Sequence, residues 1–563
     1  MVSFNEEEQE QKIGELRRRE EEDLARMLSE KYDLAYLDLS TVSINTDALR
    51  LVAEETARRA EVAAFQIVGK KLSLAIRTPN NPEVARVLED LGAHGYIVTE
   101  YMVSSEGLER AWERYKDLSF ASETKEGILD ISGAQIQELV GKLVDIGAVK
   151  AEIESVLAMK KAYRISRILE TVLAGALAVN ASDVHVEPEE SYVRLRYRLD
   201  GVLADVLTFD AETNALILSR IKLLSGMKLN VHDSAQDGRF SVKIGGSDIE
   251  VRTSVLPGAY GESVVLRVLD PATITHPIEE IGIEPALLAI VEREIRKPNG
   301  MILATGPTGS GKTTALYAFM RRIHTPQVKI ITIEDPIEYH LPGIVQTQVD
   351  GKKYTFAGGL RSALRQDPDV IMVGEIRDAE VATTAVNAAL TGHLVFSTLH
   401  TNTAAGAFPR LVDLGIDPKI VGSAVNIVMA QRLVRKLCTK CRREGTLGTD
   451  DRKIVNAILA GVVRRELIPE NTVAVFSAVG CPACNNTGYR GRIGIFEAIL
   501  IDDSIERVVK ESPSEREIAR AARPQGILSL AEDGIIKMFR GVTSMDELAR
   551  VIDLAESAAG YGK

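Results

Sequence analysis

Four short apolar runs between residues 300 and 400 have the length and character of buried β-strands. They cover residues 301–305, 329–333, 369–373 and 394–399. Continuous apolar runs, in place of strict alternation, are typical of a parallel sheet that is covered on both faces. Parallel sheets carry their ligand-binding residues at the carboxyl ends of the strands. The pattern therefore predicts an α/β domain with one chemically active edge.

A second α/β pattern precedes this domain. Residues 163–178 are predicted to form a helix, and residues 192–199 alternate like a half-buried strand. A hairpin is predicted next, with strands at 239–244 and 248–255 and a turn at Gly245-Gly246. We interpret this region as a second α/β module. The prolines between about 270 and 290 suggest a hinge before the following domain.

Composition narrows the class of protein. The 563 residues carry 68 Lys and Arg against 80 Asp and Glu, a net charge of −12. An acidic total argues against general nucleic-acid binding. No apolar run approaches the length of a membrane span, and the acidic first ten residues do not resemble a secretory signal. We therefore expect a cytoplasmic protein with no membrane span and no nucleic-acid partner.

The segment after the first apolar run fits the P-loop pattern at every required position. A predicted strand comes before it and a predicted helix comes after it, as this motif requires. Backbone N–H groups of such a loop cradle phosphate oxygens. Lys312 would reach the β- and γ-phosphates, and Thr313 would bind Mg²⁺. The sequence thus predicts ATP and Mg²⁺ bound at these residues: Gly306, Pro307, Thr308, Gly309, Ser310, Gly311, Lys312, Thr313 and Thr314.

The other three apolar runs bring acids and histidines to the same domain. Glu334 and Glu375 each follow a run, while His393 comes just before the last run and His400 just after it. A carboxylate at a strand end can orient an attacking water or hold Mg²⁺ through water, and a histidine can sense the γ-phosphate. Each residue alone is more simply read as a loop or core residue. Their combination after a P-loop favours a hydrolytic site.

All four cysteines lie near the C-terminus in two C-x-x-C pairs: Cys438, Cys441, Cys481 and Cys484. Four thiolates complete the tetrahedral shell of a structural Zn²⁺ site. Unpaired buried thiols or disulfides are the alternatives, and disulfides are disfavoured in a cytoplasmic protein. We predict one zinc ion that closes the subdomain at 438–484.

These motifs together resemble those of the secretion ATPase superfamily. Residues 306–313, 333–338, 360–369, 374–378 and 391–402 resemble its Walker A motif, aspartate box, arginine-bearing helix, Walker B motif and histidine box. Ser182 to Pro188 and Gln236 to Arg239 resemble signatures of its N-terminal domain. The C-x-x-C pairs narrow the resemblance to the type II secretion and type IV pilus assembly branch.

The resemblance implies a fold and a set of partners. The family forms homohexameric rings that hydrolyse ATP between subunits and turn an inner-membrane platform protein, so that pilins join a filament. Residues 285–563 would be a RecA-like ATPase domain, with a PAS-like domain at 151–275, a linker at 116–150, a small α/β module at 31–115 and a charged helix or tail at 1–30.

The resemblance also implies roles for individual residues. Glu334 is similar to the catalytic glutamate and Glu375 to the Walker B acid. Arg239 and Arg252 match arginines that reach the phosphates when the N-terminal domain closes on the nucleotide. Gly374 stands where many P-loop enzymes carry an aspartate, so Mg²⁺ would depend on Thr313 and water-bridged carboxylates.

Residues 1–115 match the family poorly, and they contain no clear Arg-Leu-Gly-type repeat of the kind that binds cyclic di-GMP in some relatives. We expect this segment to dock to a cytoplasmic partner at the membrane. The predicted function is a motor for type IV pilus assembly, with a type II secretion pseudopilus as the alternative. A nucleotide switch without a motor and a nucleic-acid translocase are rival classes. The translocase would use the basic residues around the first cysteine pair: Arg432, Arg435, Lys436, Lys440, Arg442 and Arg443.

Overall fold

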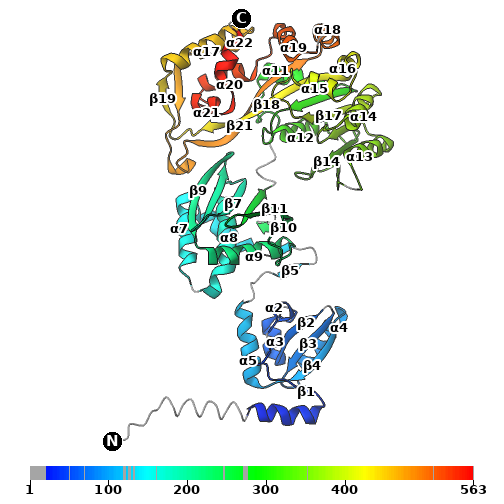
Figure 1. Ribbon diagram of the computed structural model, residues 1–563, viewed down its shortest axis with the longest axis vertical. Coiled ribbons are helices and arrows are strands. Elements are labelled where there is room, and N and C mark those ends of the chain that lie inside the picture. The colour runs from blue at the N-terminus through cyan, green and yellow to red at the C-terminus, as the bar shows by residue number, and fades with distance from the viewer. Residues whose placement is uncertain are drawn as a thin grey trace. The chain divides into compact units, whose positions relative to one another are not determined.

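The computed structural model describes residues 21–561 except 43, 50, 69, 118–121, 125–127, 131–132, 160, 245–246, 271–276, 352 and 512. It divides into two compact units, one of residues up to 132 with 153–170, the other of residues 133–152 with 171–563 (Figure 1). Most of the predicted charged tail, the hairpin turn Gly245-Gly246 and part of the predicted hinge lie outside the described residues. Among the described residues, no helix is long and apolar enough to cross a membrane.

The first unit contains a four-stranded sheet in the order β1-β4-β3-β2, with β2 and β3 antiparallel and the other neighbours parallel. Trp112 is buried in its core and donates its indole N–H to the carbonyl of Val62 at 2.9 Å. The elements are β1 (Ala35–Tyr36), α2 (Thr46–Leu49), α3 (Glu54–Ala60), β2 (Val62–Val68), β3 (Lys71–Ile76), α4 (Pro82–Ala93), β4 (Ile97–Met102), α5 (Ser105–Glu113), and the hairpin β5 (Ser122–Thr124) and β6 (Ile128–Asp130).

The region predicted as a linker is partly helical. Helix α6 (Gly133–Lys142) and helix α7 (Ile146–Leu157) occupy its second half. The small and polar residues before position 135 suggested an open connection. However, the residues that follow place apolar side chains at helical spacing, and Ile136, Leu143 and Val149 are buried. Residues 133–150 of the predicted linker are therefore mostly helical.

The second unit begins with an antiparallel sheet whose strands β10, β11, β12, β7, β8 and β9 lie side by side in that order. The predicted hairpin pairs Arg239 with Arg252, and Arg252 pairs in turn with Arg267 on the next strand. Three arginines therefore lie in one row across the sheet. The elements are α8 (Lys161–Ala178), β7 (Asp183–Pro188), β8 (Val193–Leu199), β9 (Val202–Phe209), α9 (Ala211–Leu224), β10 (Gln236–Ile244), β11 (Ser247–Gly258) and β12 (Gly261–Leu269).

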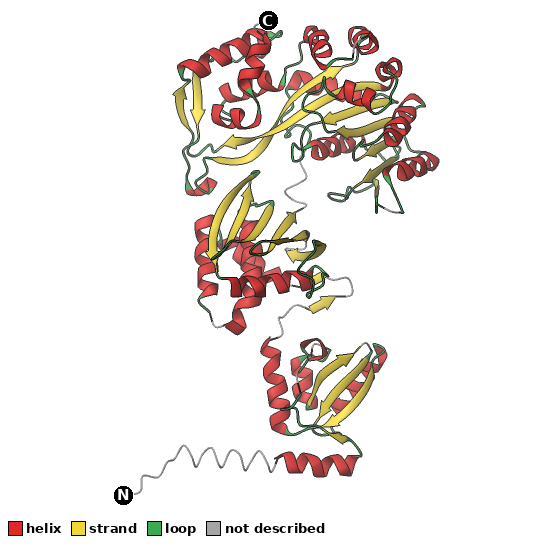
Figure 2. Ribbon diagram, in the orientation of Figure 1, coloured by secondary structure: helices red, strands yellow, loops and turns green. Residues whose placement is uncertain are grey.

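A seven-stranded sheet in the order β15-β14-β16-β17-β13-β18-β21 forms the centre of the C-terminal domain (Figure 2). All neighbours are parallel except β18 and β21. Strands β13, β14, β16 and β17 are fully buried, as their apolar runs predicted. They are β13 (Gly300–Thr305), β14 (Ile330–Glu334), β15 (Val345–Gln348), β16 (Val370–Val373), β17 (Leu394–Leu399), β18 (Val425–Leu437) and β21 (Tyr489–Leu500).

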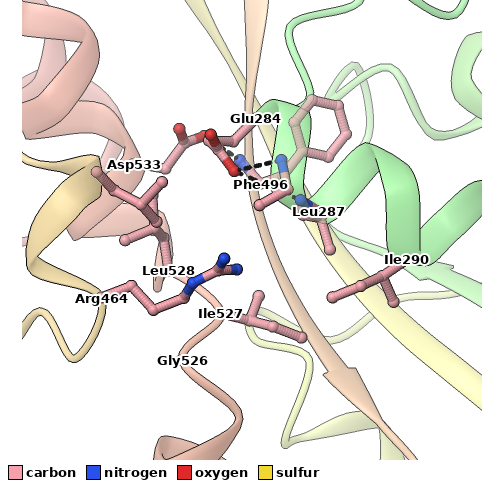
Figure 3. A pocket seen from close by; sticks show the side chains of 11 residues that line it. Glu284, Leu287, Ile290, Arg464, Phe496, Gly526, Ile527, Leu528 and Asp533 are labelled. Atoms are coloured by element: carbon pink, nitrogen blue, oxygen red, sulfur yellow. Dashed lines mark hydrogen bonds between the residues drawn. The ribbon is translucent and has the colours of Figure 1, made fainter.

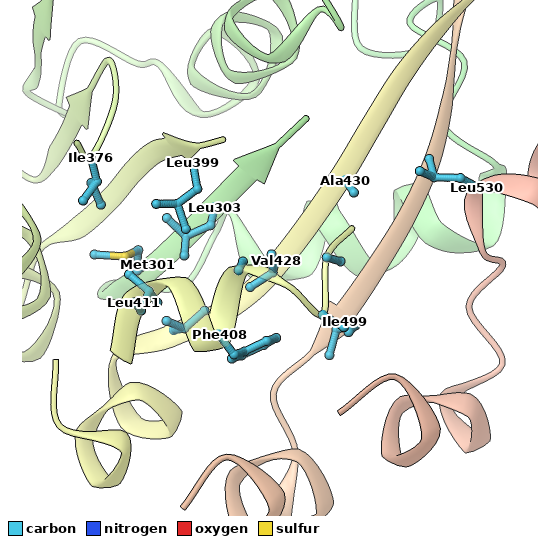
Figure 4. Packing of buried hydrophobic residues seen from close by; sticks show 14 of the residues in the cluster. Met301, Leu303, Ile376, Leu399, Phe408, Leu411, Val428, Ala430, Ile499 and Leu530 are labelled. Carbon is cyan, nitrogen blue, oxygen red and sulfur yellow. The ribbon is translucent and has the colours of Figure 1, made fainter. Parts of the chain in front are cut away.

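Apolar cores lie on both faces of this sheet. On one face, Met301 and Leu303 of β13 pack with Phe408 and Leu411 of α15 (Figure 4). On the other face, Ile302 packs with the P-loop helix and with residues 278–295. The covering helices are α11 (Pro285–Glu294), α12 (Lys312–Ile323), α13 (Phe356–Ala363), α14 (Ala379–Leu390), α15 (Ala407–Asp413), α16 (Pro418–Ala424), α18 (Asp503–Glu511) and α19 (Glu515–Ala522).

The chain after residue 277 is fixed to the C-terminal domain. Ile278, Ile281 and Ile283 are buried in its core, and the ammonium of Lys537 donates to the carbonyl of Gly282 at 2.7 Å. The hinge predicted over about 270–290 therefore cannot extend past residue 277. The remaining C-terminal elements are β19 (Arg443–Thr446), α17 (Thr449–Gly461), β20 (Ala474–Ser477), α20 (Leu530–Phe539), α21 (Met545–Val551) and α22 (Leu554–Tyr561).

Candidate nucleotide and metal sites

The P-loop connects the central strand β13 to the start of α12. Gly306, Gly309 and Gly311 adopt positive φ angles of 145°, 79° and 88°, which residues with a Cβ rarely adopt. A Cβ on Gly306 would also lie 2.6 Å from the carbonyl oxygen of Gln431. The glycines therefore let the loop turn tightly against β18 and point its N–H groups outward at the helix N-terminus, where phosphate binds.

Two side chains of the loop suit an anion. The ammonium of Lys312 donates to the carbonyls of Gly306 at 2.7 Å and Pro307 at 3.2 Å, which are weak neutral partners for a buried cation. Burial lowers the pKa of Lys312. The hydroxyl of Ser310 is buried without a hydrogen-bond partner among the described residues. A phosphate oxygen would satisfy both groups, so the chemistry of the loop fits a nucleotide.

Glu334 ends β14 and is only 2 % exposed. Its carboxylate accepts hydrogen bonds from the hydroxyls of Tyr317 and Thr332 and, at 3.1 Å, from the amide of Gln346. Tyr317 comes from the P-loop helix, and burial followed by the charge of Glu334 raises the pKa of its phenol. Tyr339 packs edge-on against Tyr317, with ring centroids 4.7 Å apart. A carboxylate with three donors is rigidly oriented.

Glu375 follows β16 and lies beside His400, which follows the neighbouring strand β17. The imidazole Nε2 of His400 is 3.1 Å from the Glu375 carboxylate, and Arg377 pairs with the other oxygen. Burial works to raise the pKa of Glu375, but the hydrogen bond and charge of Arg377, followed by those of His400, outweigh it and lower that pKa. Glu375 is therefore an anion at neutral pH.

A cleft of about 880 Å³ joins these parts. Its walls include residues 307–314 of the P-loop together with Glu334, Glu375 and His400. The parallel strands bring these residues together because they end at the same edge of the sheet. The sheet of the preceding domain also contributes, through Asp183, His185, Arg198 and Arg267.

Three of the predicted catalytic residues do not line the cleft. His393 comes before β17, at the amino edge of the sheet, where its Nδ1 is 3.1 Å from the carbonyl of Ala388. Its position gives it no direct access to a phosphate on the opposite edge. Arg239 is exposed. Arg252 pairs with Glu250 at 2.9 Å and with Glu338 at 3.3 Å.

The sequence analysis missed other residues that the structure brings to the cleft or packs directly behind it. Tyr317 is fully buried and contacts the cleft-lining Glu334; it follows the P-loop lysine by five positions, but this contact depends on the placement of β14. Arg198 and Arg267 both lie beside Asp183, at 3.3 and 3.2 Å. Arginines alternating along the strands were the only signal for them. Arg432 also lines the cleft. From the sequence it was assigned only to the basic cluster of the translocase alternative.

That basic surface is partly used within the fold. The guanidinium of Arg435 donates to the buried carboxylate of Glu547 at 2.7 and 2.9 Å and lies 4.0 Å from the ring centroid of Tyr489. Arg442 donates to the carbonyl of Gly541 at 2.6 Å and stacks on Phe476. These two arginines therefore have partners within the fold, whereas Lys436, Lys440 and Arg443 are exposed.

The four cysteines form one cluster. All their Sγ atoms lie within 4.8 Å of one another, and the pairs Cys438–Cys481, Cys441–Cys484 and Cys481–Cys484 are 3.9, 3.8 and 3.7 Å apart. A tetrahedral zinc site with Zn–S bonds of about 2.3 Å has sulfur–sulfur edges of about 3.8 Å. Backbone N–H groups of Cys481 and Gly488 point at the Cys484 sulfur at 3.2 and 3.3 Å, as thiolates require. The cluster fits zinc.

A second, small cavity lies beside α11 (Figure 3). The carboxylate of Glu284 caps α11 by accepting the backbone N–H groups of Ala286 and Leu287. The cavity is also lined by Phe496, Leu528 and Asp533. Its volume of about 10 Å³ accommodates no more than about one water molecule. It is a packing feature of the core.

The fold and the cleft define a P-loop ATPase. The sequence pattern of the family described as Type II/IV secretion system protein matches residues 158–550, and the chain belongs to this family. An MshEN domain matches residues 32–121. Our expectation that the N-terminal region matches known patterns poorly was therefore wrong. The resemblance rested on motifs that lie outside residues 32–121.

Relatives of both expected kinds are similar to this chain. Type II secretion system protein E of Aeromonas hydrophila is 44% identical over 421 residues, 74% of this chain and 82% of the relative. Type IV pilus assembly ATPase PilB of Myxococcus xanthus is 36% identical over 535 residues, 94% of this chain and 91% of the relative. The structure of the ATPase DotB of Yersinia pseudotuberculosis is 21% identical, covers 71% of this chain and 94% of DotB, and has a TM-score of 0.51, which supports the fold.

Proposed function

We propose that this chain hydrolyses ATP to drive assembly of a type IV pilus. The observation that carries the proposal is the similarity to the pilus assembly ATPase of Myxococcus xanthus over 94% of the chain, which includes the N-terminal module. A type II secretion pseudopilus is the second candidate. It is favoured by the type II secretion protein E of Dickeya dadantii, which is 38% identical over 91% of the chain and 99% of its own length.

The proposed reaction is phosphoryl transfer to water. Lys312 and Thr313 hold the phosphates, with Mg²⁺ adding positive charge beside them when bound. Glu334, oriented by Tyr317 and Thr332, polarises the attacking water. Glu375, held as an anion by Arg377, fixes His400 on the γ-phosphate side of the cleft. The P-loop residues at 306–314 act mainly through their backbone N–H groups.

Domain closure would complete the site. Arg239 and Arg252 lie side by side on β10 and β11, so both can reach phosphate only if Arg252 leaves Glu338. The γ-phosphate would supply a stronger partner and would be lost on hydrolysis, which makes the closed state dependent on ATP. We expect Arg239→Ala and Arg252→Ala to lower turnover while ADP affinity stays nearly intact; equal weakening of ATP and ADP binding would contradict this role.

We further propose that the subunits form a homohexamer on the cytoplasmic face of the inner membrane. The ring would turn an inner-membrane platform protein, and the MshEN-type module at 31–115 would dock to a second cytoplasmic partner. Cys438, Cys441, Cys481 and Cys484 would bind one structural Zn²⁺ per subunit. Mass measurement of the purified protein with ATP analogue tests the ring: a stable monomer under all nucleotide conditions would contradict it.

Deletion of the gene and complementation in the source bacterium separates the two candidates. Loss of surface pili with normal exoprotein secretion is expected, and wild-type protein should restore the pili whereas Lys312→Ala should not. Loss of secretion with normal pili would favour the pseudopilus. DNA- or RNA-stimulated ATP turnover would instead support the translocase class.

A further inference from the structure

Arg432 of β18 lies directly against the P-loop. A Cβ built on Gly306 would be 3.0 Å from its Nη1 atom, so the guanidinium packs on the first glycine of the loop. The side chain is half-buried and lines the same cleft as the phosphate-binding residues. The reaction proposed above does not include Arg432.

The hydrogen-bond partners of Arg432 are all uncharged. It donates to the carbonyl of Gln431 at 3.0 Å and to Asn402, at 2.8 Å to the carbonyl and 3.4 Å to the side-chain oxygen. No carboxylate among the described residues lies within ion-pair distance of it. Desolvation raises the pKa of the half-buried Glu497 nearby, although the charge of Arg432 works in the opposite direction, and the Glu497 oxygens accept the N–H groups of Ala404 and Leu530. Arg432 is therefore a partly desolvated cation whose hydrogen-bond partners are neutral, with Glu497 as a more distant negative charge.

A second cation approaches the same glycine. Lys312 donates to the carbonyl of Gly306 and likewise has only carbonyl partners. Burial lowers the pKa of Lys312; the charge of Glu375 opposes this shift, and the charge of Arg432 adds to it. Two partly desolvated cations close together repel each other, and a fold retains such a pair when an anion is to be bound between them.

We propose that Arg432 binds a phosphate group of the nucleotide held by the P-loop of its own chain, beside Lys312. The inference rests on the proposed nucleotide site. The planar guanidinium can exchange the Asn402 oxygens for two phosphate oxygens, a geometry for which arginine is better suited than lysine. Asn402 is the last residue of the histidine box, so this exchange would release the end of that segment when nucleotide binds.

Substitution of Arg432 tests the contact. Arg432→Gln should weaken the binding of ADP and of a non-hydrolysable ATP analogue about ten- to a hundred-fold, the usual effect of losing a charge-assisted hydrogen bond. Arg432→Lys should recover part of the loss. Arg507→Gln, on the exposed side of α18, is the matched control because it removes the same charge and should leave affinity unchanged. Unaltered affinity in Arg432→Gln would overturn the proposal.

The wild-type protein offers a second test that does not depend on folding of a variant. Phenylglyoxal modifies accessible guanidiniums, and mass spectrometry can measure its reaction at Arg432. ADP and inorganic pyrophosphate should each protect Arg432, whereas adenosine should not; protection by adenosine alone, or by none of them, would contradict a phosphate contact. Lys312→Ala tests the underlying site separately: if it binds nucleotide normally, the P-loop assignment fails whatever Arg432 does.

Discussion

The C-terminal domain contains two chemical centres that are built in opposite ways. The four cysteine sulfurs already stand at the spacing of a zinc tetrahedron and face one another. In the nucleotide cleft, each charged group is instead held by a local substitute: Lys312 by loop carbonyls, Glu334 by three donors and Glu375 by Arg377 and His400. The first centre needs one ion to be complete. The second must exchange partners, as a site that works through a cycle requires.

Among the substitutions that test this comparison, the largest effect is expected at the P-loop. Lys312→Ala removes the side chain that neutralises the phosphates, so ATP turnover should fall to background. Zinc content and folding should be unchanged, because Lys312 only contacts its own loop. A phosphate-release assay combined with elemental analysis checks both. Near-normal hydrolysis by this variant would remove the P-loop from the mechanism.

Glu334→Gln should have the next largest effect. The amide cannot accept a proton from water, and loss of a positioned base costs roughly 10² to 10⁴ in rate. ATP affinity should be retained, because Glu334 is not proposed to touch the phosphates. Single-turnover hydrolysis with measured nucleotide affinity separates the two effects. If Glu375→Gln is slower at equal affinity, the roles of the two carboxylates must be exchanged.

Loss of a zinc ligand should leave ATP binding in the cleft intact but destabilise the zinc-binding subdomain. Cys481→Ser removes one of four thiolates, and metal-binding energy in such a site is also folding energy. We expect faster proteolysis of about residues 438–495 and less than one zinc per chain, with ATP binding retained. Cys481→Ser with full zinc content, or wild-type protein that is folded without zinc, would contradict the structural role.

Local pattern was sufficient to predict the strands and the P-loop, because a buried parallel strand is a run of apolar residues and the loop is contiguous in sequence. It also predicted that Glu334, Glu375 and His400 lie together, since parallel strands end at one edge. It failed for His393, which is only one strand length from His400 yet lies on the opposite edge. The same pattern could not find Arg432, whose partner is a glycine 126 positions earlier in the chain.

Residues 133–150 show a different limit. The small and polar residues before position 135 suggested a linker, but apolar residues recur through this stretch and Ile136, Leu143 and Val149 are buried. Such short helical patterns are a weak signal until a neighbouring surface exists to bury them. Contacts between segments that are far apart in the sequence bury the apolar side chains of α6 and α7. Such contacts also determine the partners of the arginines on β10 to β12.

The smallest effect is expected at Tyr317, which lies buried beside the cleft and donates its hydroxyl to the cleft-lining Glu334. Tyr317→Phe removes one of three donors to the buried Glu334, a loss of roughly 1–3 kcal/mol. The unfolding temperature of the nucleotide-free ATPase domain should fall by a few degrees, and kcat should fall several-fold at nearly constant nucleotide affinity, because Glu334 is less well oriented.

Tyr339→Phe is the matched control for this variant. Tyr339 packs on the Tyr317 ring and its backbone carbonyl accepts from Gln346, but no hydrogen bond joins its hydroxyl to Glu334. It should retain wild-type kcat. If the two variants lose kcat equally, general packing rather than the hydrogen bond orients Glu334. If Tyr317→Phe is stabilising or faster, the three donors restrain the carboxylate in the resting state, and turnover begins with their release.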